Sequence, residues 1–236
     1  MMQSSDMQYF PLAWPFLLAL FALFLVVLTL VEIGILRHAY ERMGVPPRYV
    51  FAILLLSLVG SAINIPVARF APESMVTDRV INFYGVQYVV PVVRHSPGTI
   101  LAVNVGGALI PVLLSIYLMF KNSLYVRAVL AIAVVAVVTH WLATPVRGVG
   151  VSLPIFIPPI VAALAGLIFG WGRAAPLAYI GGCLGTLIGA DLMNLSKIPG
   201  LGAPVASIGG AGTFDGVFLV GIVAVLLSPA TRPQRR

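Results

Sequence analysis

Seven long apolar runs, separated by short segments that carry most of the charges, limit the folds open to this chain more than any other feature. A helix needs about 20 apolar residues to cross the hydrocarbon core of a bilayer, and the runs approach that length. Only 9% of the 236 residues are charged and 60% are hydrophobic, whereas about a quarter of the residues of a soluble domain are charged. We therefore predict an all-α, polytopic integral membrane protein in which residues 1–236 form a single transmembrane domain. The expected helices cover residues 11–36, 49–68, 98–120, 128–143, 153–170, 174–195 and 210–228.

The basic residues predict how these helices are oriented. Nine of the 14 Lys and Arg residues fall in the loops of one side and in the C-terminal tail, and the other five fall in the loops of the opposite side. Because short cytoplasmic loops are enriched in Lys and Arg, we expect the N-terminus outside and the C-terminus inside. The partner implied by the net charge of +7 is then the lipid bilayer and not a nucleic acid.

Residues 70–97 are the only sizeable segment that we expect outside the membrane. Within it, residues 79–94 are rich in Val, Ile, Tyr and Phe and contain Gly85 near their middle. β-branched and aromatic residues on both sides of a glycine are typical of a hairpin. We therefore expect a short, β-hairpin-like ribbon on the outer surface.

Two aspartates, Asp191 and Asp215, lie in the last pair of expected helices, residues 174–228. At 1.5 Å per residue, each is about 6–8 Å from its helix end, on the same side of the membrane. Helices joined by a short connection usually pack side by side, so the two carboxylates can face each other. Two close, poorly solvated carboxylates share one proton, which gives an acid and a base that can activate water. The alternative is that each aspartate caps the glycine-rich connection and is solvated separately.

The sequence around both aspartates resembles a known protease group. Residues 212–216, Gly-Thr-Phe-Asp-Gly, resemble the Gly-x-Gly-Asp helix of presenilin and signal-peptide-peptidase-type intramembrane aspartyl proteases. Residues 190–192, Ala-Asp-Leu, are similar to the Tyr-Asp helix of that group. Phe214 and Ala190 stand where that group has Gly and Tyr. The resemblance implies that Asp191 and Asp215 are a catalytic dyad, without a cofactor or metal, that cleaves transmembrane-helix substrates.

The same resemblance suggests which neighbouring residues shape the substrate site. They are Gly189, Gly212, Phe214 and Gly216.

Over its full length the chain resembles a family of uncharacterised prokaryotic multi-pass membrane proteins. The stretches that carry this resemblance are Gly-Ala-Asp-Leu at 189–192 and Gly-Thr-Phe-Asp-Gly at 212–216. It implies no activity. It does imply a prokaryotic inner (cytoplasmic) membrane as the location, because helical spans belong there rather than in an outer membrane.

Gly181, Gly185 and Gly189 are spaced by four residues and form one small-residue stripe on a helix. Such a stripe lets a second helix approach closely. We expect it to pack against the helix at 210–228 or against a second copy in a homo-oligomer. A groove for a substrate helix is the alternative.

Other polar residues in the apolar runs support a different class of function. Glu32, Asn64, Asn104 and His140 lie in or near the first four expected helices. Together with the aspartates they could bind protons or cations in a small secondary transporter or permease. A third alternative is a non-catalytic membrane scaffold. The three histidines, 38, 95 and 140, are far apart in the sequence, which argues against a metal site.

Overall fold

The computed structural model describes residues 14–71, 74–83, 86–95, 98–146, 150–199, 203–210 and 216–229. The chain divides into two compact units, Met1–His38 and Ala39–Arg236. The described part of the first unit is a single helix, α1 (Trp14–Arg42), whose last residues belong to the second unit. Most of α1 is apolar, as expected for the run at 11–36.

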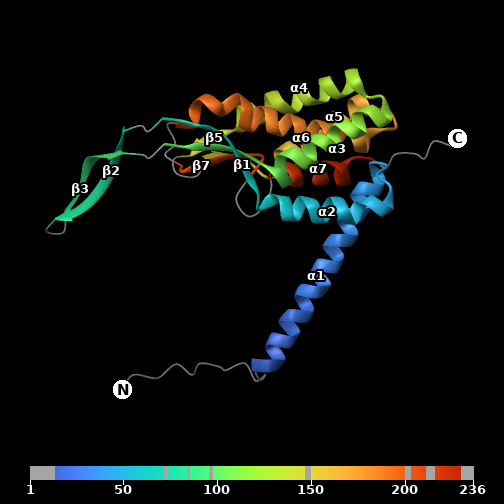
Figure 1. The fold of residues 1–236 in the computed structure, drawn as a ribbon, viewed down its shortest axis with the longest axis horizontal. Coiled ribbons are helices and arrows are strands. Elements are labelled where there is room, and N and C mark those ends of the chain that lie inside the picture. Colours follow the sequence, from blue (N-terminus) through green and yellow to red (C-terminus); the bar gives the residue numbers. More distant parts are fainter. Residues whose placement is uncertain are drawn as a thin grey trace. The chain divides into compact units, whose positions relative to one another are not determined.

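The second unit contains the other six α-helices of the described chain (Figure 1). Proline lies in the first turn of three of them, at Pro47, Pro111 and Pro158. Proline suits this position because the first turn of a helix has no use for the missing N–H group. The helices are α2 (Pro47–Ser61), α3 (Ile110–Asn122), α4 (Tyr125–Leu142), α5 (Ile157–Gly170), α6 (Ala174–Thr186) and α7 (Gly216–Leu227).

Helix α6 is the centre of the second unit. It packs against α3, α4, α5 and α7, and every one of its residues except Leu184 is buried. Figure 1 shows α6 surrounded by these neighbours. Its contact with α7 is close, because a Cβ atom added to Gly221 would lie only 2.3 Å from Cys183 Sγ. The predicted packing of these two helices against each other is therefore confirmed.

The glycine stripe of α6 faces α4, not α7. A Cβ atom added to Gly185 would lie 2.6 Å from Val135 Cβ, and one added to Gly189 would lie 2.0 Å from Thr139 Oγ1. Gly181 faces Ala131 in the same way, at 3.1 Å. The role of the stripe in close helix packing is confirmed, but the expected partner was wrong. The face on which we expected contact with α7 or with a second copy is covered by α4 of the same chain.

Three short strands form a sheet in the order β1-β4-β7. They are β1 (Asn64–Arg69), β4 (Ile100–Asn104) and β7 (Val205–Ile208). β1 and β4 are antiparallel, and β4 and β7 are parallel. The sheet thus joins three separate segments of the chain: β1 follows α2, β4 precedes α3 and β7 precedes α7.

Two further strand pairs are hairpins. β2 (Ser74–Phe83) and β3 (Val86–His95) pair in antiparallel register from Ser74 with His95 to Phe83 with Val86. This confirms the ribbon predicted within residues 70–97. The second pair, β5 (Thr144–Val146) and β6 (Gly150–Ser152), was not predicted.

Two of the expected transmembrane helices are wrong over part of their length. The helix expected at 49–68 ends at Ser61 and is followed by β1, and the one expected at 98–120 begins as strand β4. Pro66 supplies one physical reason, because proline has no N–H group to continue a helix. The other reason is that a short apolar run does not distinguish a buried strand from a buried helix.

Among the described residues, three helical segments are long and apolar enough to cross a membrane. They are Val105–Asn122, Tyr125–Leu142 and Ala174–Lys197. The shorter apolar helices are Pro47–Ser61, Ile157–Gly170 and Gly216–Leu227. These lengths and compositions indicate a membrane protein that is mostly helical but also contains small sheets.

Candidate functional site

The helix that carries Asp191 changes its winding just before this residue. α6 continues into a π-helical turn, η2 (Leu187–Asp191), and then into a 3₁₀ segment, η3 (Leu192–Lys197). Single π turns within helices occur frequently at functional sites, because the extra residue in the turn leaves backbone groups without their usual partners. Asp191 is the last residue of the π turn and is half-buried.

The Asp191 carboxylate is held from the side of the sheet. Its Oδ2 atom accepts a hydrogen bond of 2.7 Å from the backbone N–H of Gly209, the residue directly after β7. Gly209 has a φ of +79°, a region that favours glycine. A Cβ atom here would also lie 2.7 Å from the Ala108 backbone nitrogen. Both conformation and space therefore require glycine at the position that binds Asp191.

Asn194 ties the same turn to the end of α4. Its side chain is fully buried, and Nδ2 donates to the carbonyl oxygens of Gly189 at 3.0 Å and Ala190 at 2.9 Å. The same nitrogen is 3.3 Å from His140 Nδ1, and Lys197 Nζ donates to Asn194 Oδ1 at 2.8 Å. One buried amide thus connects the two residues before Asp191 with a histidine and a lysine.

A second group of polar side chains organises the strand ends. Asn104, at the end of β4, accepts a hydrogen bond of 2.7 Å from the Gly107 N–H and so caps a second π turn, η1 (Val105–Leu109). Its Nδ2 donates to Ser61 O at 2.8 Å and to Asn64 Oδ1 at 3.2 Å. Ser207 of β7 donates to the same Asn64 oxygen at 2.5 Å. These side chains join β1, β4 and β7 to one another and to the end of α2 and the start of η1.

The structure describes some of the predicted site residues and not others. Gly189 is buried against α4, and Gly216 is the first residue of α7. Asp215, Gly212 and Phe214 lie outside the described residues, so the facing of the two carboxylates stays a prediction. Of the other polar residues that we singled out, Asn64 and Asn104 come together, whereas Glu32 is exposed on α1.

Sequence reasoning missed the residues that hold Asp191 in place, Asn194 and Gly209. A signal for Asn194 was present, because a residue three positions after Asp191 lies on the same side of a helix. Gly209 could not be identified, because nothing in the sequence shows that β7 runs beside η2. No group of three or more His, Cys, Asp or Glu residues that could hold a metal ion occurs within the described ranges.

The arrangement gives Asp191 one occupied and one open oxygen, as far as the described residues show. Its Oδ2 accepts a hydrogen bond from a backbone donor, and no hydrogen bond to Oδ1 is made within the described part. A half-buried carboxylate of this kind can accept a proton from water or bind a cation. Both chemistries depend on what faces it.

The comparisons with known proteins give a family but no activity. A family model, DUF1614, described as a protein of unknown function, matches residues 58–227. No curated protein and no solved structure matches the chain. The matched range includes the sheet, both π turns and all helices from α3 to α7.

Proposed function

Because the chain belongs to the DUF1614 family, whose description names no activity, we propose its function from the site: an intramembrane aspartyl-protease-like hydrolase. Asp191 and Asp215 are the proposed catalytic pair, and the proposed substrates are peptide bonds of transmembrane helices. This proposal is based in part on the local resemblance to presenilin and signal-peptide-peptidase-type proteases.

One observation carries the proposal: the Asp191 carboxylate is bound by the residue that directly follows strand β7. β7 pairs with β4 on one side, and its other side pairs with no strand in the described part of the chain. A free strand edge binds an extended peptide through backbone hydrogen bonds. A helical substrate must unwind before its peptide bonds become accessible. An edge strand can hold the unwound peptide, and the neighbouring carboxylate can then act on its peptide bond.

The proposed reaction needs two carboxylates that share one proton. The ionised aspartate takes a proton from a water molecule, whose oxygen attacks the carbonyl carbon of the substrate, while the protonated aspartate donates its proton to the carbonyl oxygen. Collapse of the resulting diol breaks the C–N bond and passes a proton to the leaving amine. The π turn favours this chemistry because it places Asp191 at the end of an apolar helix, where few water molecules compete.

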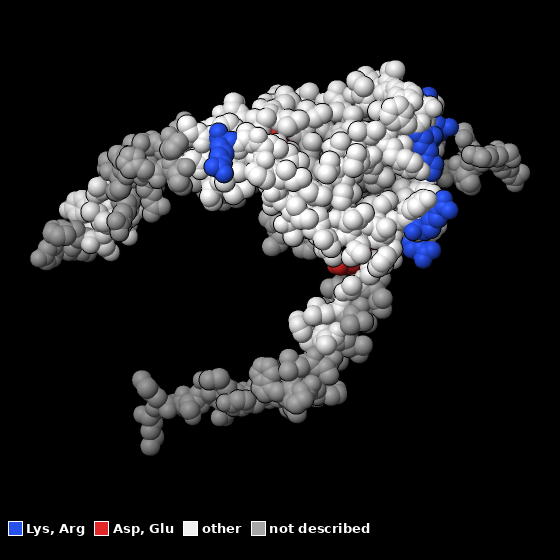
Figure 2. Space-filling view, in the orientation of Figure 1, with Lys and Arg blue, Asp and Glu red and all other residues white. Residues whose placement is uncertain are grey.

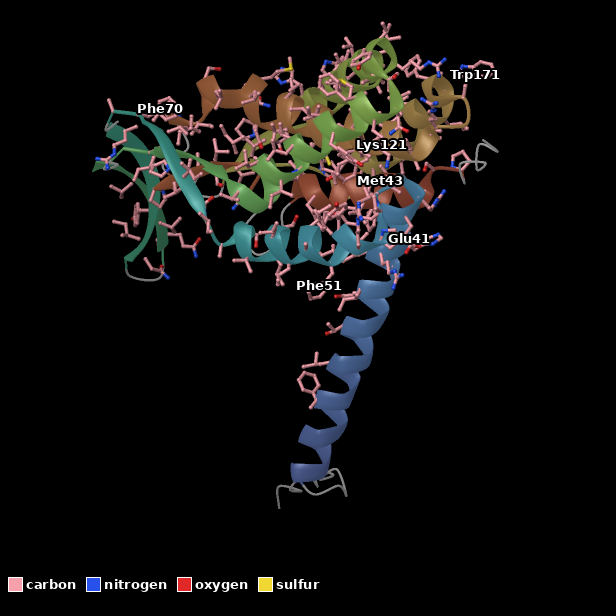
Figure 3. The ribbon with its side chains drawn as sticks, turned by 45° about the vertical axis from the view of Figure 1, so that its right-hand side comes forward. Glu41, Met43, Phe51, Phe70, Lys121 and Trp171 are labelled. Carbon is pink, nitrogen blue, oxygen red and sulfur yellow. The ribbon has the colours of Figure 1, made fainter. Side chains whose placement is uncertain are left out.

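The proposed membrane arrangement has seven spans with the N-terminus outside. Figure 2 shows basic side chains gathered at the end of the second unit where α1 and α3 end and where α2, α4 and α6 begin. Figure 3 places Lys121 and the exposed Trp171 at this end. Basic and aromatic residues together are typical of the cytoplasmic interface of a membrane. We place this end at the cytoplasmic face of a prokaryotic inner membrane, and the Asp191 end at the outer face.

A second candidate function, a proton- or cation-coupled transporter, is favoured by the two π turns. η1 begins the helix that continues as α3, and η2 breaks the α-helical winding after α6; Asn104 and Asp191 lie at these two π turns. Interrupted helices with polar residues form the ion sites of many transporters. In this function the carboxylates would bind the ion and no peptide bond would be cut.

The test uses the protein purified in detergent and reconstituted into liposomes with a single-span test substrate. Asp191→Asn and Asp215→Asn should each abolish cleavage while thermal unfolding stays close to that of the wild type. Glu32→Gln is the matched control, because it makes the same change on an exposed carboxylate of α1 and should leave cleavage unchanged. Loss of pH- or cation-driven uptake in the two Asn variants, with no cleavage by the wild type, would favour the transporter. Unfolding of both Asn variants would show that the aspartates are structural.

A further inference from the structure

We propose that Asn194 is the positioning residue of the Asp191 site, and that it fixes His140 as a neutral donor through Nε2–H. The catalytic meaning of this inference rests on the proposed function. The hydrogen bonds from which it is drawn do not.

The chemistry of its partners determines which way the Asn194 amide points. Lys197 Nζ can only donate, so the atom at 2.8 Å from it must be the amide oxygen. The carbonyl oxygens of Gly189 and Ala190 can only accept, so they must face the amide nitrogen. The two requirements agree, and the fully buried amide has no second orientation that would satisfy its partners.

This orientation decides the tautomer of His140. Asn194 Nδ2 can only donate, and it carries two hydrogens for three neighbours. The adjacent carbonyl oxygens of Gly189 and Ala190 share one hydrogen, so His140 Nδ1, at 3.3 Å, accepts the other. A neutral imidazole that accepts at Nδ1 carries its proton at Nε2. His140 therefore keeps its Nε2–H group as a donor for a partner other than Asn194. Helix α4 ends just after His140 and packs against the π turn that contains Asp191.

Asn194 also fixes the carboxylate. The carbonyl oxygens that it binds belong to the two residues directly before Asp191 in the π turn, and Gly209 binds the carboxylate itself. Asp191 is thus held from α4 on one side and from β7 on the other.

Asn194→Asp is the most informative change. It keeps an oxygen for Lys197 but replaces the donor to Gly189, Ala190 and His140 with a second acceptor. His140 Nδ1 would then face an oxygen, so the proton should move to Nδ1. Thr139→Val is the control, because Thr139 is buried on α4 beside His140, but its hydroxyl donates to Val135 O, Ala136 O and Gly185 O and not to Asn194.

The measurement is ¹⁵N NMR of histidine-labelled protein in detergent at a pH above neutrality. The signal of His140 is identified by its loss in His140→Gln, and the only other histidines are His38 and His95. We expect a bare Nδ1 and a protonated Nε2 in the wild type and in Thr139→Val, and a protonated Nδ1 in Asn194→Asp. A protonated Nδ1 in the wild type overturns the proposal even if Asn194→Asp does not fold, and so does an unchanged tautomer in a folded Asn194→Asp.

The kinetic measurement separates this inference from the proposed function. If the protein cleaves the test substrate, Asn194→Asp should lower kcat by about 100-fold with little change in KM, because the substrate still binds but the carboxylate is misplaced. An unchanged kcat would overturn the positioning role. A wild type that shows the expected tautomer but cleaves nothing would contradict the proposed function and leave the assignment of His140 intact.

Discussion

The contact between α4 and α6 and the junction between α6 and the three-stranded sheet hold the same helix in opposite ways. Along α4, the helix is held by close packing: a Cβ atom added to Gly181 or Gly185 would lie 3.1 Å from Ala131 Cβ or 2.6 Å from Val135 Cβ. At the sheet, the helix winds differently and is held by hydrogen bonds from Asn194 and Gly209. Lipid tails are as apolar as the side chains of the core, so helices in a membrane gain little from hydrophobicity and depend on close packing. Backbone that leaves the helical pattern needs polar partners instead.

This difference predicts which kind of change each region tolerates. The α4–α6 contact should respond to side-chain volume and hardly to polarity. The junction should respond to lost donors and to backbone conformation. Thermal or denaturant unfolding of the protein in detergent measures both responses.

Gly185→Ala should have the largest effect. The added methyl group would lie 2.6 Å from Val135 Cβ, and the two helices would have to separate. We expect a loss of about 3 kcal/mol in the free energy of unfolding, at the upper end of overpacking effects. Gly34→Ala, on α1 with nothing within 4 Å, is the control and should be neutral or slightly stabilising.

A double-mutant cycle sharpens this prediction. Val135→Gly removes the atom that the new methyl group would meet, so the double variant should lose clearly less than the sum of the two single changes. Strict additivity would mean that Gly185 and Val135 are not in contact, which would disprove the packing described for this stripe.

Gly209→Ala should cost about 2 kcal/mol, because it combines a positive φ with a blocked position. Gly172 has a similar φ of +84° but nothing within 4 Å, so Gly172→Ala measures the conformational part alone. The difference between the two variants reports the contact with Ala108. Equal losses would show that this contact is absent. In the protease assay, Gly209→Ala should also reduce cleavage, because the shifted backbone moves its N–H donor away from the Asp191 carboxylate.

Asn104→Ala should cost about 1.5 kcal/mol, in the range of lost helix caps. It leaves the Gly107 N–H without its acceptor and the Ser61 carbonyl without its donor. Asn122→Ala is the control, because Asn122 Nδ2 makes one local bond to Leu118 O and should contribute less. A loss as small as that of Asn122→Ala would mean that the strand ends are not held by Asn104.

The contrast also explains what the sequence could and could not predict. The helices α4 to α7 follow from apolar length, and the hairpin at 70–97 follows from β-branched and aromatic residues around Gly85. The helices predicted at 49–68 and 98–120 were wrong at these ends because the apolar residues of β1 and β4 continue the apolar runs of the helices beside them. Pro66 and Asn104 were the local signals that the helical pattern stops there.

Only part of the candidate site was predictable from the sequence. Asp191 stands out in the sequence because a carboxylate in an apolar run is costly. Its partner Gly209 does not stand out, because it comes from a distant segment that only the sheet brings close. His140 was singled out as a polar residue, but nothing in the sequence linked it to Asn194. The partner of the glycine stripe was wrong because four-residue spacing shows that a helix approaches, but not which one.

The basic end of the second unit gives the smallest predicted effect. It tests whether charged side chains, besides close packing and buried hydrogen bonds, stabilise the helices. Lys121 Nζ donates to the Gly44 carbonyl oxygen and lies 5.5 Å from the centre of the Tyr117 ring. Because this side chain is exposed, Lys121→Met should cost only about 0.5 kcal/mol, and less at high salt. Arg127→Met, which also removes an exposed cation close to this turn, is the control and should change stability still less. A loss above about 2 kcal/mol for Lys121→Met would show that charge, and not only packing and buried hydrogen bonds, sets the stability of this protein.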